Sequence, residues 1–108
     1  MKALYKPVNG AWEMREIPNT LKALQETVGG YIETVTLRDG SVAICDEEGK
    51  LKGKKMNAII NGIPFAGDLI VCGTKGAEFC GLQIESPEEW LTGNEVVWRE
   101  GAKLKCSP

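Results

Sequence analysis

Residues 21–33 constrain the fold most, because they join an expected helix directly to an expected strand. Apolar residues recur from Leu21 to Val28 at the i, i+3 and i+7 spacing that lines one face of a helix. Gly29 has no Cβ, so it can adopt the left-handed backbone conformation that ends a helix. Residues 31–37 have the β-branched and aromatic composition of a strand. The stretch therefore predicts a helix that packs on a sheet.

Turn residues predict three hairpins along the chain. Asparagine–glycine and aspartate–glycine pairs supply the positive backbone angles that tight hairpin turns need. Such pairs occur at Asn9-Gly10 and at Asp39-Gly40, and Thr74-Lys75-Gly76 links a third pair of strands. The expected strands are residues 2–6 and 11–17, 31–37 and 41–45, and 68–73 and 77–82.

The remaining segments give one firm helix start and two open alternatives. Residues 56–62 fit one or two turns of helix or an irregular loop, because so few residues carry no clear period. Ser86 as the cap, Pro87 at the first helical position and Glu89 closing a capping box predict a short helix. Residues 94–98 form either a final strand or another extension, and we expect residues 101–108 to be loosely held.

These elements predict an α+β domain, with a mostly antiparallel β-sheet and two or three short helices packed on it. A chain of 108 residues is long enough for one domain, here residues 1–108. Residues 1–82 would form its core, and residues 83–108 a C-terminal helix followed by a strand or tail. A hydrophobic content of 43% and a charged content of 26% are ordinary for a soluble protein.

The expected location is the cytoplasm, without a membrane partner. No segment approaches the roughly 20 apolar residues that cross a bilayer. The first seven residues are too few and too polar for a secretory signal. The four cysteines form no Cys-x-x-Cys pair, and the chain has no histidine. We therefore expect reduced, mostly buried cysteines and no metal site.

The residue types that usually carry catalysis are sparse. Without histidine the commonest general base is missing. Asp39 and Asp46 occupy turn positions, where aspartate ordinarily forms the turn itself. Cys80 has no activating partner that the sequence reveals. These observations predict a protein that is not an enzyme and needs no cofactor.

A basic segment in the middle of the chain is the best candidate for binding. The net charge is −2, yet residues 49–76 contain five lysines and only one acidic residue, Asp68. The overall charge makes nucleic acid an unlikely partner, but this segment could hold a small anion such as a nucleotide. The alternatives are a solvated loop and tryptophans that belong to the core. The candidate ligand-binding residues are Arg38, Lys54, Lys55, Asn57, Trp90 and Trp98.

Several blocks resemble a family of small domains of unknown function found on phages, prophages and conjugative elements of Firmicutes. The resemblance covers roughly residues 2–82, and its most specific part is the Leu-x-Ala-Leu-Gln-x-x-Val-Gly-Gly-Tyr-Ile-Glu block at 21–33. Relatives usually have proline before the asparagine that corresponds to Asn57, where this chain has Met56. The supporting matches are residues 45–51, Asn57 and Asp68-x-Ile70-x-x-Gly73.

The habitat of such domains implies a counter-defence role. We expect a non-enzymatic protein that sequesters a nucleotide-type immune signal, as a homo-oligomer. Two alternatives remain: a protein–protein inhibitor of a defence effector such as a CRISPR nuclease, and an accessory domain of a mobile element with no defence role.

Overall fold

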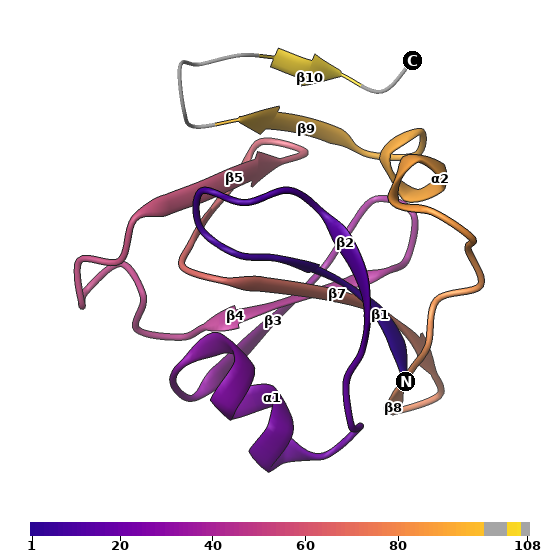
Figure 1. Ribbon diagram of the computed structural model, residues 1–108, viewed down its shortest axis with the longest axis horizontal. Coiled ribbons are helices and arrows are strands. Elements are labelled where there is room, and N and C mark those ends of the chain that lie inside the picture. The colour runs from indigo at the N-terminus through magenta and orange to yellow at the C-terminus, as the bar shows by residue number, and fades with distance from the viewer. Residues whose placement is uncertain (99–103, 107–108) are drawn as a thin grey trace.

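The structure is a computed structural model that describes residues 1–98 and 104–106 (Figure 1). For Trp98 and residues 104–106 it describes the backbone alone. Two helices occur in this part of the chain, α1 (Leu21–Val28) and α2 (Pro87–Leu91). With a mostly antiparallel sheet, they confirm the predicted α+β class.

The strands form two antiparallel sheets. The six-stranded sheet has the order β2 (Glu13–Glu16), β1 (Lys2–Lys6), β7 (Leu69–Lys75), β4 (Val42–Asp46) and β3 (Ile32–Thr36), with β8 (Glu78–Cys80) paired to β7. The four-stranded sheet has the order β10 (Leu104–Cys106), β9 (Glu95–Trp98), β5 (Met56–Ile60) and β6 (Ile63–Ala66).

The molecule has three layers, because α1 and the four-stranded sheet cover opposite faces of the six-stranded sheet (Figure 1). Side chains alternate between the two faces along a strand. On β7, Ile70 and Cys72 pack in the cluster that contains Leu24 of α1, whereas Leu69 and Val71 pack with residues of the four-stranded sheet. Each face of the central sheet therefore has its own apolar core.

Helix α1 begins and ends where its local sequence predicts. The Oγ1 atom of Thr20 accepts a hydrogen bond from the amide of Ala23 at 3.1 Å. Gly29 has a φ of 81°, and its amide donates to the Gln25 carbonyl. The left-handed conformation expected of Gly29 is therefore confirmed.

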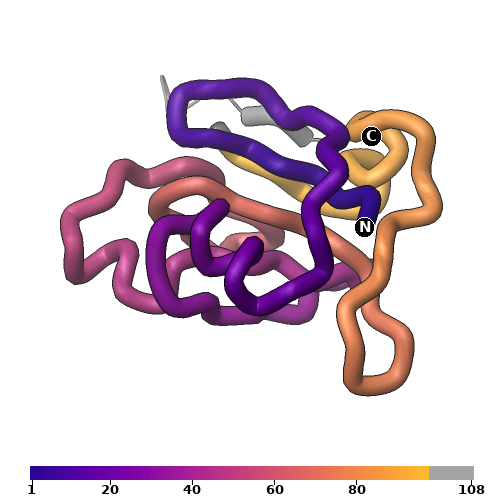
Figure 2. The backbone as a smooth tube through the Cα atoms, turned by 60° about the horizontal axis from the view of Figure 1, so that its bottom comes forward, coloured from indigo at the N-terminus to yellow at the C-terminus, as the bar shows by residue number. Residues whose placement is uncertain are grey.

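The predicted hairpins are confirmed as β1–β2, β3–β4 and β7–β8. The β7–β8 hairpin extends away from the body of the molecule (Figure 2). Asn19 Nδ2 donates to the carbonyl of Phe79 on this hairpin at 2.9 Å.

The helix-or-loop prediction for residues 56–62 is wrong. Strand β5 turns through Asn61 (φ 52°) and Gly62 (φ 85°) into β6, so the pair is another tight hairpin. Strand β5 also pairs with β9, which places Ile59 opposite Val97. Pairing with β6 on one side and with the distant β9 on the other, rather than the local period, makes the segment a strand.

The start of α2 follows the prediction only in part. Ser86 is the capping residue and Pro87 begins the helix, but the Ser86 side chain makes no capping bond. Glu89 Oε1 accepts from the Glu85 amide at 2.7 Å, so the expected capping box is not formed. The alternative strand at 94–98 is present as β9. Most of the tail expected at 101–108 lies outside the described residues.

Candidate functional site

A compact loop between β4 and β5 carries most of the predicted basic segment. Asp46 Oδ1 accepts from the Glu48 amide at 2.9 Å, and the Gly49 amide donates to the Asp46 carbonyl at 3.0 Å. The Lys54 amide closes the loop by donating to the Gly49 carbonyl at 2.9 Å. These bonds return the chain to the end of β4, so Lys52 and Lys54 both reach Asp46.

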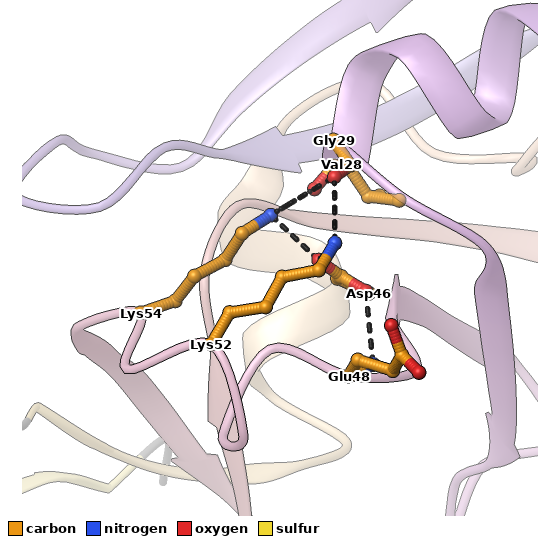
Figure 3. A network of polar contacts seen from close by, with 6 residues as sticks. All are labelled: Val28, Gly29, Asp46, Glu48, Lys52 and Lys54. Carbon is orange, nitrogen blue, oxygen red and sulfur yellow. Dashed lines mark hydrogen bonds and ion pairs between the residues drawn. The ribbon is translucent and has the colours of Figure 1, made fainter.

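Two ammonium groups meet one carboxylate at the end of α1 (Figure 3). Lys52 Nζ lies 2.8 Å and Lys54 Nζ lies 2.7 Å from Asp46 Oδ2. Lys54 Nζ also donates to the carbonyl of Val28 at 2.8 Å, and Lys52 Nζ to that of Gly29 at 3.3 Å. The last carbonyls of a helix carry partial negative charge, so the two lysines stabilise this helix end as well as the carboxylate.

The electrostatics of this cluster favour a charged Asp46. Burial alone would raise its pKa, but hydrogen bonds from Lys52, Lys54 and the Glu48 amide hold the pKa far below its usual range. The bond to Asp46 in turn raises the pKa of Lys52. The Asp46 side chain has no exposed surface. The cluster is thus an ion-paired joint between α1 and the loop.

Beside this joint lies a cleft of about 390 Å³, formed by the last turn of α1, the β1–β2 turn and residues 54–55 and 67–68. Lys54 and Lys55, two of the predicted ligand-binding residues, line it. Its volume falls within the roughly 300–1,000 Å³ typical of small-molecule sites. The structure thus places part of the predicted basic segment against a cavity.

The polar groups of the cleft differ in how strongly they are engaged. Asp68 accepts from the Tyr5 hydroxyl at 3.0 Å and from the Val8 amide at 2.9 Å, so both of its oxygens have a partner. Lys54 is held by Asp46. Lys55 and Glu26 are exposed at the surface of the chain. The cleft therefore has one exposed ammonium, that of Lys55, and one exposed carboxylate, that of Glu26.

A buried lysine and a buried asparagine lie next to the part of the cleft lined by residues 67–68. Lys6 is 1% exposed, and its Nζ donates to Asn57 Oδ1. Asn57 Nδ2 donates to the carbonyls of Lys6 and Gly67, both at 2.8 Å. Burial lowers the pKa of Lys6 to about 8, although the charge of Asp68 opposes this shift. Asn57 therefore joins β1, β5 and the Gly67 turn, and its side chain has no exposed amide for a ligand.

The other candidate residues lie away from the cleft. Arg38 is exposed in the β3–β4 turn, at the opposite end of β4 from Asp46. Trp90 is 3% exposed, packs against Trp12 with a ring-centroid distance of 4.9 Å, and donates through Nε1 to Ser41 Oγ at 3.0 Å. The Trp98 side chain lies outside the described residues. Among the candidates whose side chains the structure describes, Lys54 and Lys55 are the two that lie together.

The sequence predicts neither the ion pairs of Asp46 nor most of the residues that line the cleft. Asp46 was expected only as a turn residue; it does form the turn, and it also binds two lysines. The alternation of Lys50, Lys52 and Lys54 after an acidic turn was the available signal. Nothing local indicates that Glu26 or Asp68 would face the same cleft.

No group of three or more potential metal ligands occurs in the described part of the chain. Cys45, Cys72 and Cys80 are free thiols, and burial raises the pKa of Cys45 and of Cys72 to about 11. The Cys45 and Cys72 thiols are therefore poor nucleophiles at neutral pH. No helix among the described residues is long and apolar enough to cross a bilayer.

A comparison with known protein families identifies the family of this chain. Residues 1–93 match the family described as domain of unknown function DUF3846, so the chain belongs to this family. No curated protein and no solved structure matches it. The match extends the resemblance expected for residues 2–82 as far as α2.

Proposed function

We propose that this domain is a non-enzymatic binding module that holds a nucleotide-type small molecule in the cleft beside the end of α1. The observation that carries this proposal is the coincidence of a cavity of about 390 Å³ with Lys54 and Lys55 in its wall. A cavity of this size suits a ligand of nucleotide dimensions.

The charges of the cleft suit a ligand that offers both an anion and hydrogen-bond donors. The Lys55 ammonium can bind a phosphate as a point charge. Glu26 in the same cleft can accept from ribose hydroxyls or from the amino group of a base. A bare phosphate would gain from Lys55 but would be repelled by Glu26 and Asp68. This combination favours a nucleotide over an inorganic anion.

The biological role that we propose is counter-defence, by sequestration of an immune signal. Support comes from the resemblance to small domains of phages and mobile elements. Further support comes from the absence of histidine in the sequence, which removes the commonest general base. A protein that only binds its ligand needs a cleft and complementary charges, and it needs no acid–base pair.

Isothermal titration calorimetry tests this function directly. The purified protein is titrated with cyclic mononucleotides, cyclic dinucleotides, ADP-ribose-type molecules and inorganic phosphate. Saturable binding of a nucleotide, with much weaker binding of phosphate, is the expected result. Absence of binding to every nucleotide at high protein concentration would overturn the proposal.

A second candidate is a protein–protein inhibitor, and one observation favours it. Leu51 is 88% exposed and Tyr31 is 68% exposed. The Tyr31 carbonyl accepts from the Glu47 amide at 2.8 Å, so Tyr31 adjoins the loop that carries Leu51. Large exposed apolar side chains on adjoining segments are a feature of contact surfaces when they form one patch. Capture of a stoichiometric defence protein by the parent chain, and its loss with Leu51→Ser, would support this alternative.

A further inference from the structure

Strand β3 forms one edge of the six-stranded sheet. Among the described strands it pairs only with β4. Its sequence is Ile-Glu-Thr-Val-Thr, which contains four β-branched residues, one charge and no proline. Such composition has high β-propensity, and an edge of this kind is a template for another strand.

The hydrogen bonds at both ends of the β3–β4 hairpin show which backbone groups face outward. The Tyr31 carbonyl accepts from the Glu47 amide at 2.8 Å, and the Leu37 amide donates to the Ser41 carbonyl at 2.7 Å. In an antiparallel pair the residues that bond to the partner strand alternate with those that bond away from it. The odd-numbered residues therefore bond to β4. The amides and carbonyls of Ile32, Thr34 and Thr36 point away from the sheet.

Two other edges carry the features that ordinarily prevent edge pairing. Strand β2, at the opposite edge of the same sheet, has three charged residues among its four. Strand β6, at one edge of the four-stranded sheet, contains Pro64. Charges and proline are the usual means of blocking a sheet edge. Strand β3 lacks both protections except for Glu33.

We infer that β3 pairs with β3 of a second copy of this chain, antiparallel, about a twofold axis at Thr34. Thr34 then lies opposite Thr34 of the second copy, and Ile32 lies opposite Thr36 of the second copy. All of these residues have outward-facing backbone groups, so the pairing forms about six hydrogen bonds. Because the contact uses the same surface on both chains, it closes as a dimer.

The single charge on the strand selects this register. A twofold axis at Glu33 would place two carboxylates directly opposite each other, which is destabilising. An axis at Val35 would shift the strands and place Arg38 opposite Ile32. The axis at Thr34 places Glu33 opposite Val35, and threonine pairs are favourable across antiparallel strands. Charge and backbone complementarity therefore agree on one arrangement.

Light scattering after size-exclusion chromatography, together with native mass spectrometry, tests the dimer. The parent protein should have twice the mass of one chain. Thr34→Pro removes an outward amide and should give the mass of a single chain, whereas Thr34→Val keeps the amide and should remain dimeric. The matched control is Glu16→Pro, since Met1 and Ile17 bond to each other and so leave the Glu16 amide facing outward on β2.

Cysteine cross-linking tests the register. In a background with Cys80→Ser and Cys106→Ser, Thr34→Cys should form a covalent dimer on addition of an oxidant, because residues directly opposite have the spacing that a disulfide needs. Thr36→Cys should not, since its own copy lies four positions away along the paired strand. A monomeric parent at millimolar concentration, a dimer that survives Thr34→Pro, or cross-linking through position 36 instead of 34 would overturn the inference.

Discussion

The Lys54 ammonium lies 2.7 Å from the Asp46 carboxylate, whose side chain is completely buried. The same ammonium donates to the Val28 carbonyl at 2.8 Å. One lysine therefore connects the end of α1 to the end of β4, and the connection forms one wall of the cleft. The stability of this joint and the shape of the cleft therefore depend on the same side chain.

Replacing the buried carboxylate should destabilise the protein. We expect Asp46→Asn to lower the free energy of unfolding by about 2 kcal/mol, because charge-assisted hydrogen bonds from Lys52 and Lys54 are weakened. Urea denaturation measures this change. Glu47→Gln, at the next and exposed position, removes the same charge and should change stability by less than about 0.5 kcal/mol. Equal effects of the two substitutions would contradict a special role for Asp46.

Acid should remove the contribution of Asp46. Its pKa in the folded protein is lowered, so its stabilisation is fully present above the unfolded pKa of about 3.9 and is lost as the pH falls below it. Urea denaturation at a series of pH values should show a decline from about pH 5 downward. In Asp46→Asn this decline should be shallower. A variant curve parallel to that of the parent would exclude Asp46 as its cause.

Lys6 gives a prediction on the alkaline side. Burial lowers its pKa to about 8 in the folded protein, whereas the unfolded value is about 10.4. Between these values the unfolded chain binds more protons, so the Lys6 contribution to stability increases as the pH rises from 8 toward 10. Lys6→Met should remove this increase, whatever its effect at neutral pH. The measurement is thermal or urea denaturation across that range, and an unchanged slope would be evidence against the shift.

A side chain at Gly29 should be poorly tolerated. Gly29→Val should cost more than about 1 kcal/mol, because its φ is 81° and a β-branched residue resists this conformation. An added Cβ would also lie 2.8 Å from Lys54 Nζ. Gly40→Val is the matched control, since Gly40 has a φ of 90° but no atom within 4 Å of such a Cβ. A larger melting-temperature loss at position 29 isolates the contact with Lys54.

If the cleft binds a nucleotide, Lys55 should contribute to its affinity. Lys55→Gln should weaken binding about tenfold by calorimetry, the equivalent of one charge-assisted hydrogen bond. Lys75→Gln makes the same charge change on the β7–β8 hairpin, away from the cleft, and should leave affinity unchanged. A loss common to both variants would indicate only a general electrostatic effect. Neither substitution should alter the melting temperature, because both side chains are exposed.

Features that depend on neighbouring residues were predictable. The spacing from Leu21 to Val28, the glycine that ends α1 and the turn pairs of the hairpins act over a few positions, so the sequence carries their cause. The family to which residues 1–93 belong is likewise readable from the sequence. Within the candidate site, local charge indicated the basic segment that carries Lys54 and Lys55, and these two residues line the cleft.

Other features depend on contacts between distant residues. Strand β5 pairs with β6 through the Asn61-Gly62 turn and with the distant β9, and its five residues have no decisive period of their own. Asn57 is directed inward by Lys6, and Trp90 by Trp12 and Ser41. Asp46 acquires its lowered pKa only when the loop returns Lys52 and Lys54 to it. The sequence by itself determined the local elements and the family, because short-range spacing and turn chemistry suffice for these. Tertiary structure alone decided which polar side chains are buried and which face the cleft, because those outcomes are set by long-range packing and desolvation.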